Sequence, residues 1–243
     1  FSVGQVPAAA VHEIQRTSRE RFNVAVDVFS GSQIATLLAE PDLFWIASHY
    51  LDVPNSMAPP PRVEASPEWY DELLARLRAN GSPEAMTLGI LGEIASGVRQ
   101  ATWDPEANGD LPEWLTYLRP FLAETNEDGT ESELSFGACY ETAVATLRGM
   151  GNLSGAENLL RRAVDQGLRS DDVSQVADAS TLLGYWGGAW SAGVTEADAH
   201  EISDAVNHMR EHADALLNAT DPATYPLRST SLLETLVRLY FVP

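Results

Sequence analysis

The feature that most constrains the fold is a series of helix start signals in the chain after residue 66. Ser66-Pro67-Glu68 and Ser82-Pro83-Glu84 share one design, and Asp104-Pro105-Glu106 and Asp110 before Leu111-Pro112-Glu113 repeat it. Each signal places a capping side chain before a proline at the first helical position, and an acid then faces the positive end of the helix dipole. These signals predict a succession of helices.

Apolar residues recur at helical spacing between the signals, and turn glycines separate the segments. We predict helices over residues 67–79, 83–101, 111–124, 132–149, 154–167, 171–186, 195–218 and 228–241. Helices of this length joined by short turns are typical of an α-helical hairpin array or bundle. No exact sequence period supports a named repeat family.

The first 52 residues have a different pattern. Residues 1–7 are short and apolar and predict a strand, and residues 8–22 have helical spacing. Residues 22–29 alternate strictly through Val24, Val26 and Val28, which predicts a second strand, and a helix follows the turn at residues 30–32. Strand, helix, strand and helix form a parallel crossover unit. Because two strands do not make a stable sheet alone, we expect other strands from upstream or from a partner, and the chain to be part of a longer protein.

The predicted fold class is therefore mainly α, with a short α/β segment of two parallel strands at the amino terminus. Residues 1–52 form this partial α/β segment. Residues 53–66 contain four prolines and are interpreted as an extended linker. Residues 67–243 form the helical, repeat-like domain.

Composition excludes several kinds of chemistry. All 15 basic residues other than histidine are arginine, so a phosphate-loop lysine and a Schiff-base lysine are impossible. The net charge of −20 argues against a nucleic-acid surface, because phosphate binding needs clustered basic residues. No stretch of eighteen apolar residues predicts a membrane span, and we expect a cytoplasmic protein. Cys139 lies on an apolar helical stripe and is interpreted as a buried small hydrophobe.

One motif has the spacing of a metal site. His208, Glu211 and His212 fit the H-x-x-E-H pattern of one zinc protease class, in which two histidines hold the metal and the glutamate activates its water. On a helical wheel Glu211 falls almost opposite the apolar stripe and the two histidines lie on one flank, as expected of a solvated face. We therefore assign no catalytic residue, cofactor or metal site, and keep these three residues as weak candidates for zinc.

An aromatic and glycine-rich cluster offers a second kind of site. Tyr185, Trp186 and Trp190 stand among Gly187 and Gly188. Aromatic side chains often anchor protein interfaces, although such clusters are also common in cores and at helix ends. We predict these three aromatic residues as partner-binding anchors.

The run FNVAVDVFSGSQIATLLAEPDLFWIASHYLDVP, residues 22–54, resembles the end of restriction-endonuclease-like domains of the Mrr type. Phe29-Ser30-Gly31, Ile34, Leu37-Leu38 and Phe44-Trp45-Ile46-Ala47 carry the resemblance. It is similar also to multidomain actinobacterial proteins of phage-defence systems, in which such a domain precedes helical regions. In that family the metal-binding acids and lysine precede this segment, so the resemblance assigns no active-site residue to this chain.

We therefore expect a non-catalytic helical scaffold or sensor region of a larger bacterial defence-type protein, which binds a protein partner. Two alternatives remain open. The chain is part of a metal-dependent nuclease whose active site lies outside it, or it is a helical zinc-dependent hydrolase that uses His208, Glu211 and His212.

Overall fold

The computed structural model describes residues 8–26, 29, 31–40, 43–58, 68–81, 83, 85–126, 132–195 and 197–242, and these residues are mainly helical. The α-helices are α1 (Ala8–Phe22), α2 (Gly31–Leu38), α3 (Phe44–Leu51), α4 (Glu68–Asn80), α5 (Leu88–Trp103), α6 (Leu111–Leu118), α7 (Glu133–Val144), α8 (Leu153–Arg169), α9 (Val173–Ser191), α10 (Ala199–Ala219) and α11 (Pro226–Leu239). Short 3-10 turns are η1 (Asn55–Met57), η2 (Asn108–Asp110) and η3 (Phe121–Ala123), and η4 (Ala145–Gly149) is a π-helical turn that continues α7. The prediction of a mainly α protein is confirmed.

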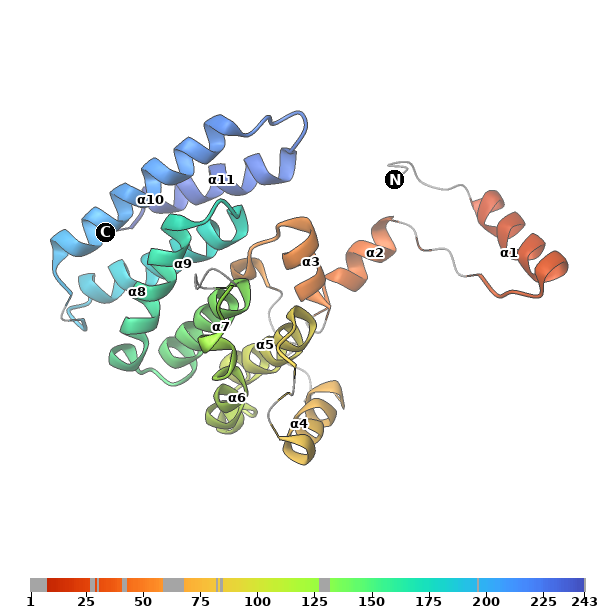
Figure 1. Ribbon diagram of the computed structural model, residues 1–243, viewed down its shortest axis with the longest axis horizontal. Helices are drawn as coiled ribbons and strands as arrows, with labels where there is room; N and C mark the ends of the chain where they lie inside the picture. Colours follow the sequence, from red (N-terminus) through yellow and green to blue (C-terminus); the bar gives the residue numbers. More distant parts are fainter. Residues whose placement is uncertain are drawn as a thin grey trace.

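Helices adjacent in sequence pack on one another through most of the chain. α7 packs on α8, α8 on α9 and α10 on α11, while α9 also contacts α10 and α11 (Figure 1). One core cluster lies among α7 to α11, and a second lies among α4, α5 and α6. α7 joins the two, because Cys139 and Tyr140 belong to the first cluster and Ala138 to the second. Cys139 is fully buried, as predicted from its place on an apolar stripe.

The predicted second strand is wrong in its described part. Phe22 ends α1, and residues 23–26 and 29 are neither helix nor strand. Asn23 takes a positive φ of 53°, and the Val24 N–H donates to the Ser18 carbonyl at 3.2 Å, so this segment closes the helix. Alternating valines form a strand only where a neighbouring strand takes their hydrogen bonds, and no described residue does so here. The first predicted strand, residues 1–7, lies outside the described residues.

Several predicted helix boundaries also shift. α5 begins at Leu88 rather than near Pro83, because the Thr87 hydroxyl accepts the Ile90 N–H at 3.3 Å and caps the helix there. The helix predicted over 132–149 changes from α-helical to π-helical geometry at Ala145.

The amino-terminal segments divide between an arm and the helical body. α1 lies away from the other helices, and α2 connects toward α3 (Figure 1). α3 packs on α5, and η1 packs on α9. Residues 53–58, the described part of the segment interpreted as a linker, are therefore attached to the helical body, while residues 59–66 lie outside the described residues. Among the described residues, no helix is both long and apolar enough to cross a bilayer.

Candidate functional site

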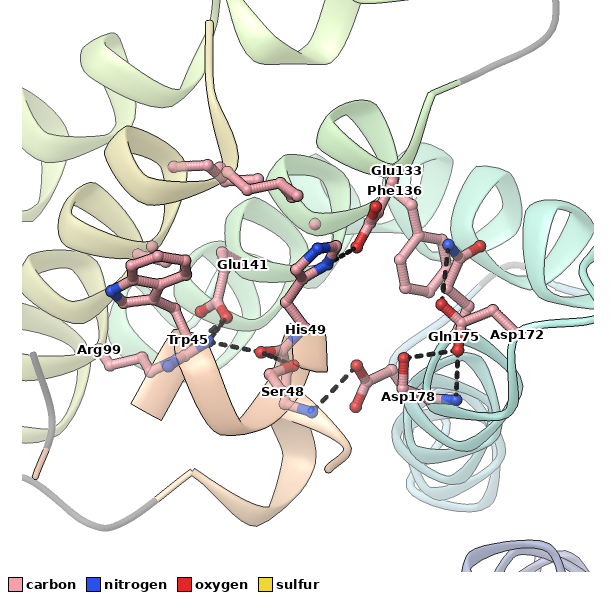
Figure 2. A pocket seen from close by; sticks show the side chains of 17 residues that line it. Trp45, Ser48, His49, Arg99, Glu133, Phe136, Glu141, Asp172, Gln175 and Asp178 are labelled. Atoms are coloured by element: carbon pink, nitrogen blue, oxygen red, sulfur yellow. Dashed lines mark hydrogen bonds and ion pairs between the residues drawn. The ribbon is translucent and has the colours of Figure 1, made fainter. Parts of the chain in front are cut away.

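A pocket of about 70 Å³ lies where α3 and η1 meet α5, α7 and α9 (Figure 2). Its walls carry four carboxylates and one guanidinium, in addition to a histidine and the rings of two aromatic side chains. The charged and aromatic lining residues are Trp45, His49, Arg99, Glu133, Phe136, Glu141, Asp172 and Asp178. Because the four carboxylates outnumber the single guanidinium, the lining has an excess of acceptors and of negative charge.

The base of the pocket is a buried ion pair between α5 and α7. The Arg99 guanidinium donates from Nε to Glu141 Oε1 at 2.9 Å and from Nη2 to the same oxygen, and it lies over the Phe44 ring. Burial raises the pKa of the Glu141 carboxyl, and the charge of Arg99 opposes this shift. No hydrogen bond to Glu141 Oε2 is found among the described residues, which leaves this oxygen as an acceptor in a pocket wall.

Asp178 of α9 accepts two backbone hydrogen bonds from η1. Its Oδ1 accepts the Ser56 N–H at 2.8 Å and its Oδ2 accepts the Asn55 N–H at 3.1 Å. The Asp178 residue is only 1% exposed, and this burial raises its pKa to about 7 in spite of the two backbone donors, which lower it. A carboxyl group with such a pKa changes its charge near neutral pH.

Asn55 links this carboxyl group to the ion pair. Its side-chain Oδ1 accepts from Arg99 Nη2 at 2.9 Å and from the Ser48 hydroxyl at 3.1 Å. The polar contacts of α3 and η1 therefore converge on groups from α5, α7 and α9. The pocket has its full set of walls only when residues 44–57 are seated on the helical body.

The rim is polar and more open. His49 Nδ1 lies 2.8 Å from Glu133 Oε1, and the two side chains are 29% and 45% exposed. Asp172 caps the start of α9, where its Oδ1 accepts the Ser174 N–H at 2.8 Å. Figure 2 shows His49 and Glu133 facing one another above the Arg99 and Glu141 pair.

Trp45 forms a wall because α5 has a glycine where the indole lies. A Cβ added at Gly92 would come under 3.0 Å from the Trp45 side chain. The missing side chain thus lets α3 approach α5 closely, and the indole ring lies at the edge of the pocket.

The three residues kept as weak candidates for zinc do not converge on a metal position. His208 and Glu211 are exposed on α10, and His212 Nε2 lies 2.8 Å from the Ser170 carbonyl oxygen. The described part of the chain contains no group of three or more histidine, cysteine or acidic side chains placed to hold a metal ion.

The predicted aromatic anchors differ in exposure. Trp186 is 2% exposed, belongs to the core, and donates from Nε1 to Glu157 at 3.3 Å. Tyr185 is half-buried with Arg148 over its ring, and Trp190 is 39% exposed. Because helix α9 continues to Ser191, its inward face buries Trp186, which therefore cannot anchor a partner on the folded surface.

The sequence analysis missed Arg99, Glu141 and Asp178. The signal was present, since Glu141 stands alone among small and apolar residues in SFGACYETAVA, and Asp178 does so in SQVADASTLLG. A lone acid on an inward helical face must have a partner, because an isolated buried charge is costly. What the sequence could not reveal was that the partners come from residues 55, 56 and 99.

The fold and the pocket define an acidic, mainly helical protein with a polar pocket between its helices. Comparison with protein-family models, with curated proteins and with solved structures finds no match to this chain. The geometry of the pocket and the charge of the chain are the features that bear on function.

Proposed function

We propose that this chain is a non-catalytic helical scaffold that binds a protein partner by accepting a basic side chain of that partner in the pocket between α3, α5, α7 and α9. The observation that carries the proposal is the lining, which holds four carboxylates against a single guanidinium, together with the Trp45 and Phe136 rings. A guanidinium or ammonium group binds well to carboxylates and to the faces of aromatic rings.

The size of the pocket supports a side chain as its occupant. Pockets that enclose whole cofactors or drug-sized molecules measure roughly 300–1,000 Å³. A cavity of about 70 Å³ has room for the end of one long side chain, with the rest of the partner outside. Its rim, formed by the half-buried His49 and the exposed Glu133, suits entry from solvent.

The charge of the chain supports a basic partner. At a net charge of −20 the protein attracts cationic segments over distances well beyond contact, and this attraction accelerates their encounter. The same field disfavours nucleic acid. The pocket then supplies the specific contact that a diffuse negative surface lacks.

The setting that we propose, a region of a larger bacterial defence-type protein, is supported only by the resemblance of residues 22–54 to restriction-endonuclease-like domains. Binding at the pocket does not depend on it. Metal-dependent cleavage of DNA by the full-length gene product, absent from this chain alone, would favour a role within a nuclease.

The test uses two short peptides that differ only in whether one side chain is charged. A glycine-rich peptide with one central arginine is titrated into the protein while NMR monitors the indole signal of Trp45, and the same peptide with citrulline is the neutral control. We expect the arginine peptide alone to shift the Trp45 signal. Equal binding of the citrulline peptide would contradict the proposal.

Matched protein variants locate the site. Glu133→Gln removes a rim charge, and we expect it to weaken binding of the arginine peptide about fivefold, the effect of losing about 1 kcal/mol at an exposed ion pair. Glu211→Gln removes the same charge from the exposed face of α10 and should leave binding unchanged. Equal losses in the two variants would mean that the general negative field, and not the pocket, holds the peptide.

A further inference from the structure

The outward side of α11 exposes several large apolar side chains. α10 and α11 form one end of the molecule, and α11 lies against α9 and α10 through the face that buries Ser229, Leu232, Thr235 and Leu239 (Figure 1). On the opposite face the large apolar side chains are between 53% and 80% exposed, and they are Leu227, Leu233, Val237, Tyr240 and Phe241. Scattered exposed apolar residues are ordinary, but a continuous row along one helix marks an interaction surface.

The spacing of this row indicates a helical occupant. Residues 226, 230, 233, 237 and 240 are all exposed, and they follow one another in steps of four, three, four and three. This alternation is that of a coiled-coil seam, in which side chains of one helix fit between those of a second helix. We call residues 226, 230, 233, 237 and 240 the α11 seam.

The charge around the α11 seam selects the helix that covers it. The seam positions carry no charge, and the charged residues of α11 are two arginines and one glutamate in a chain of net charge −20. The Arg210 guanidinium of α10 also lies over the Tyr240 ring. Two copies of this chain can meet here without placing acidic surfaces in contact. A strongly basic helix would instead find few acids at this surface.

The α11 seam is also self-complementary. Leu233 is its central residue, with Pro226 at one end and Tyr240 at the other. A twofold axis beside Leu233 would bring Pro226 of one copy opposite Tyr240 of the other, and Thr230 close to Val237. Contacts of this kind, in which the same patch serves both subunits, are the basis of most homodimers.

We propose that two copies of this chain associate through their α11 seams as an antiparallel helix pair. The interface goes beyond the proposed scaffold function and is independent of it, because the pocket lies among other helices. Association stabilises each copy by removing the exposed leucine, valine and aromatic side chains from water.

Sedimentation equilibrium tests the proposal directly. We expect the wild-type protein to approach twice its chain mass of 26.4 kDa as concentration rises. Because both copies are strongly acidic, the association should strengthen between about 0.05 M and about 0.5 M NaCl as salt screens their repulsion. A protein that stays monomeric over the whole range, or a dimer that weakens with salt, would overturn the proposal.

Variants locate the interface. Leu233→Asp should abolish the dimer with an unchanged far-UV circular dichroism spectrum, because the side chain that it replaces is exposed in the single copy. Val194→Asp introduces the same charge at another exposed apolar residue, between α9 and α10, and should leave the dimer intact. Persistence of the dimer in Leu233→Asp would refute the seam.

A cross-link supplies a geometric criterion that does not depend on affinity. Leu233→Cys adds one exposed thiol to a chain whose own cysteine is buried. A residue beside a twofold axis meets its own copy, so mild oxidation should yield a disulfide-linked dimer. Val194→Cys is the control and should run as a monomer on non-reducing SDS–PAGE. Equal cross-linking of the two variants would show random collision and count against the seam.

Discussion

Two glycines of α5 each lie against a tryptophan side chain, and the two sites differ in what surrounds the indole. Trp114 lies against Gly97, is fully buried, and donates from Nε1 to the Tyr70 hydroxyl at 2.8 Å. Trp45 lies against Gly92, is half-buried, and borders the pocket. In both places a glycine of α5 lets a tryptophan pack closely against the helix. At Gly97 the tryptophan completes the core, and at Gly92 it forms a wall of the polar pocket.

The two indoles differ in burial because different side chains surround each ring. Around Trp114, apolar side chains of α4, α5 and α6 fill the available volume, and Tyr70 satisfies the indole nitrogen. Around Trp45, the neighbouring groups include the Arg99 and Glu141 pair, so apolar packing is interrupted. A buried ion pair is poor evidence for stability but is common in binding sites.

The largest effect is expected from Gly97→Ala. The added Cβ would lie under 3.0 Å from the Trp114 ring, which is held on all sides and cannot withdraw. We expect a loss of about 3 kcal/mol in the free energy of unfolding, the upper range of overpacking in a close-packed core. Urea denaturation followed by tryptophan fluorescence measures this loss. A smaller loss for Gly97→Ala than for Gly92→Ala would show that the Trp114 site is the more tolerant of the two.

The next effect concerns the proton affinity of Asp178. Its pKa rises from 3.8 to about 7 on folding, so between these values the folded chain binds more proton than the unfolded chain. The contribution of Asp178 to stability is therefore complete below its unfolded pKa and is lost as pH rises toward 7. Between pH 5.5 and 7.5 we expect a loss of about 2 kcal/mol, at about 1.4 kcal/mol for each unit.

This pH dependence is isolated by comparing variants. Asp178→Asn cannot titrate, so its free energy of unfolding should fall about 2 kcal/mol less than that of wild type over the same interval. Asp214→Asn on the exposed face of α10 is the control and should follow wild type. Parallel curves for wild type and Asp178→Asn would show that the Asp178 carboxyl does not titrate in this range.

The smallest stability effect is expected from Gly92→Ala. Its Cβ would also come under 3.0 Å from the Trp45 side chain, mainly at Cβ and Cγ, but Trp45 is half-buried, so an outward shift of α3 relieves the contact. We expect a loss of about 1 kcal/mol in the free energy of unfolding. Because the pocket wall moves, binding of the arginine peptide should be lost as well. Retained binding would mean that Trp45 does not shape the pocket.

Structural features that depend on interactions between residues close in sequence are predicted better than those that depend on distant residues. Helix signals act within one turn, so most helices after residue 67 appear close to their predicted places, as α8 and α10 show. The alternating valines at 24, 26 and 28 predict a strand that the described residues 23–26 do not form, because a strand depends on a distant neighbour that the described residues do not supply. The histidine pattern on α10, kept only as a weak candidate, matches a metal motif in spacing, but the described residues bring no further ligand beside it.

The sequence by itself determined the helical class, the burial of Cys139 and the strong negative charge, since propensity, periodicity and composition are local or additive properties. Only the tertiary structure decided where the pocket lies. Asn55 and Asp178 are separated by 123 residues, yet one donates its backbone N–H to the carboxylate of the other. Such a pairing depends on how the helices stack, because a carboxylate on an inward face takes whichever donors the packed neighbours bring within reach.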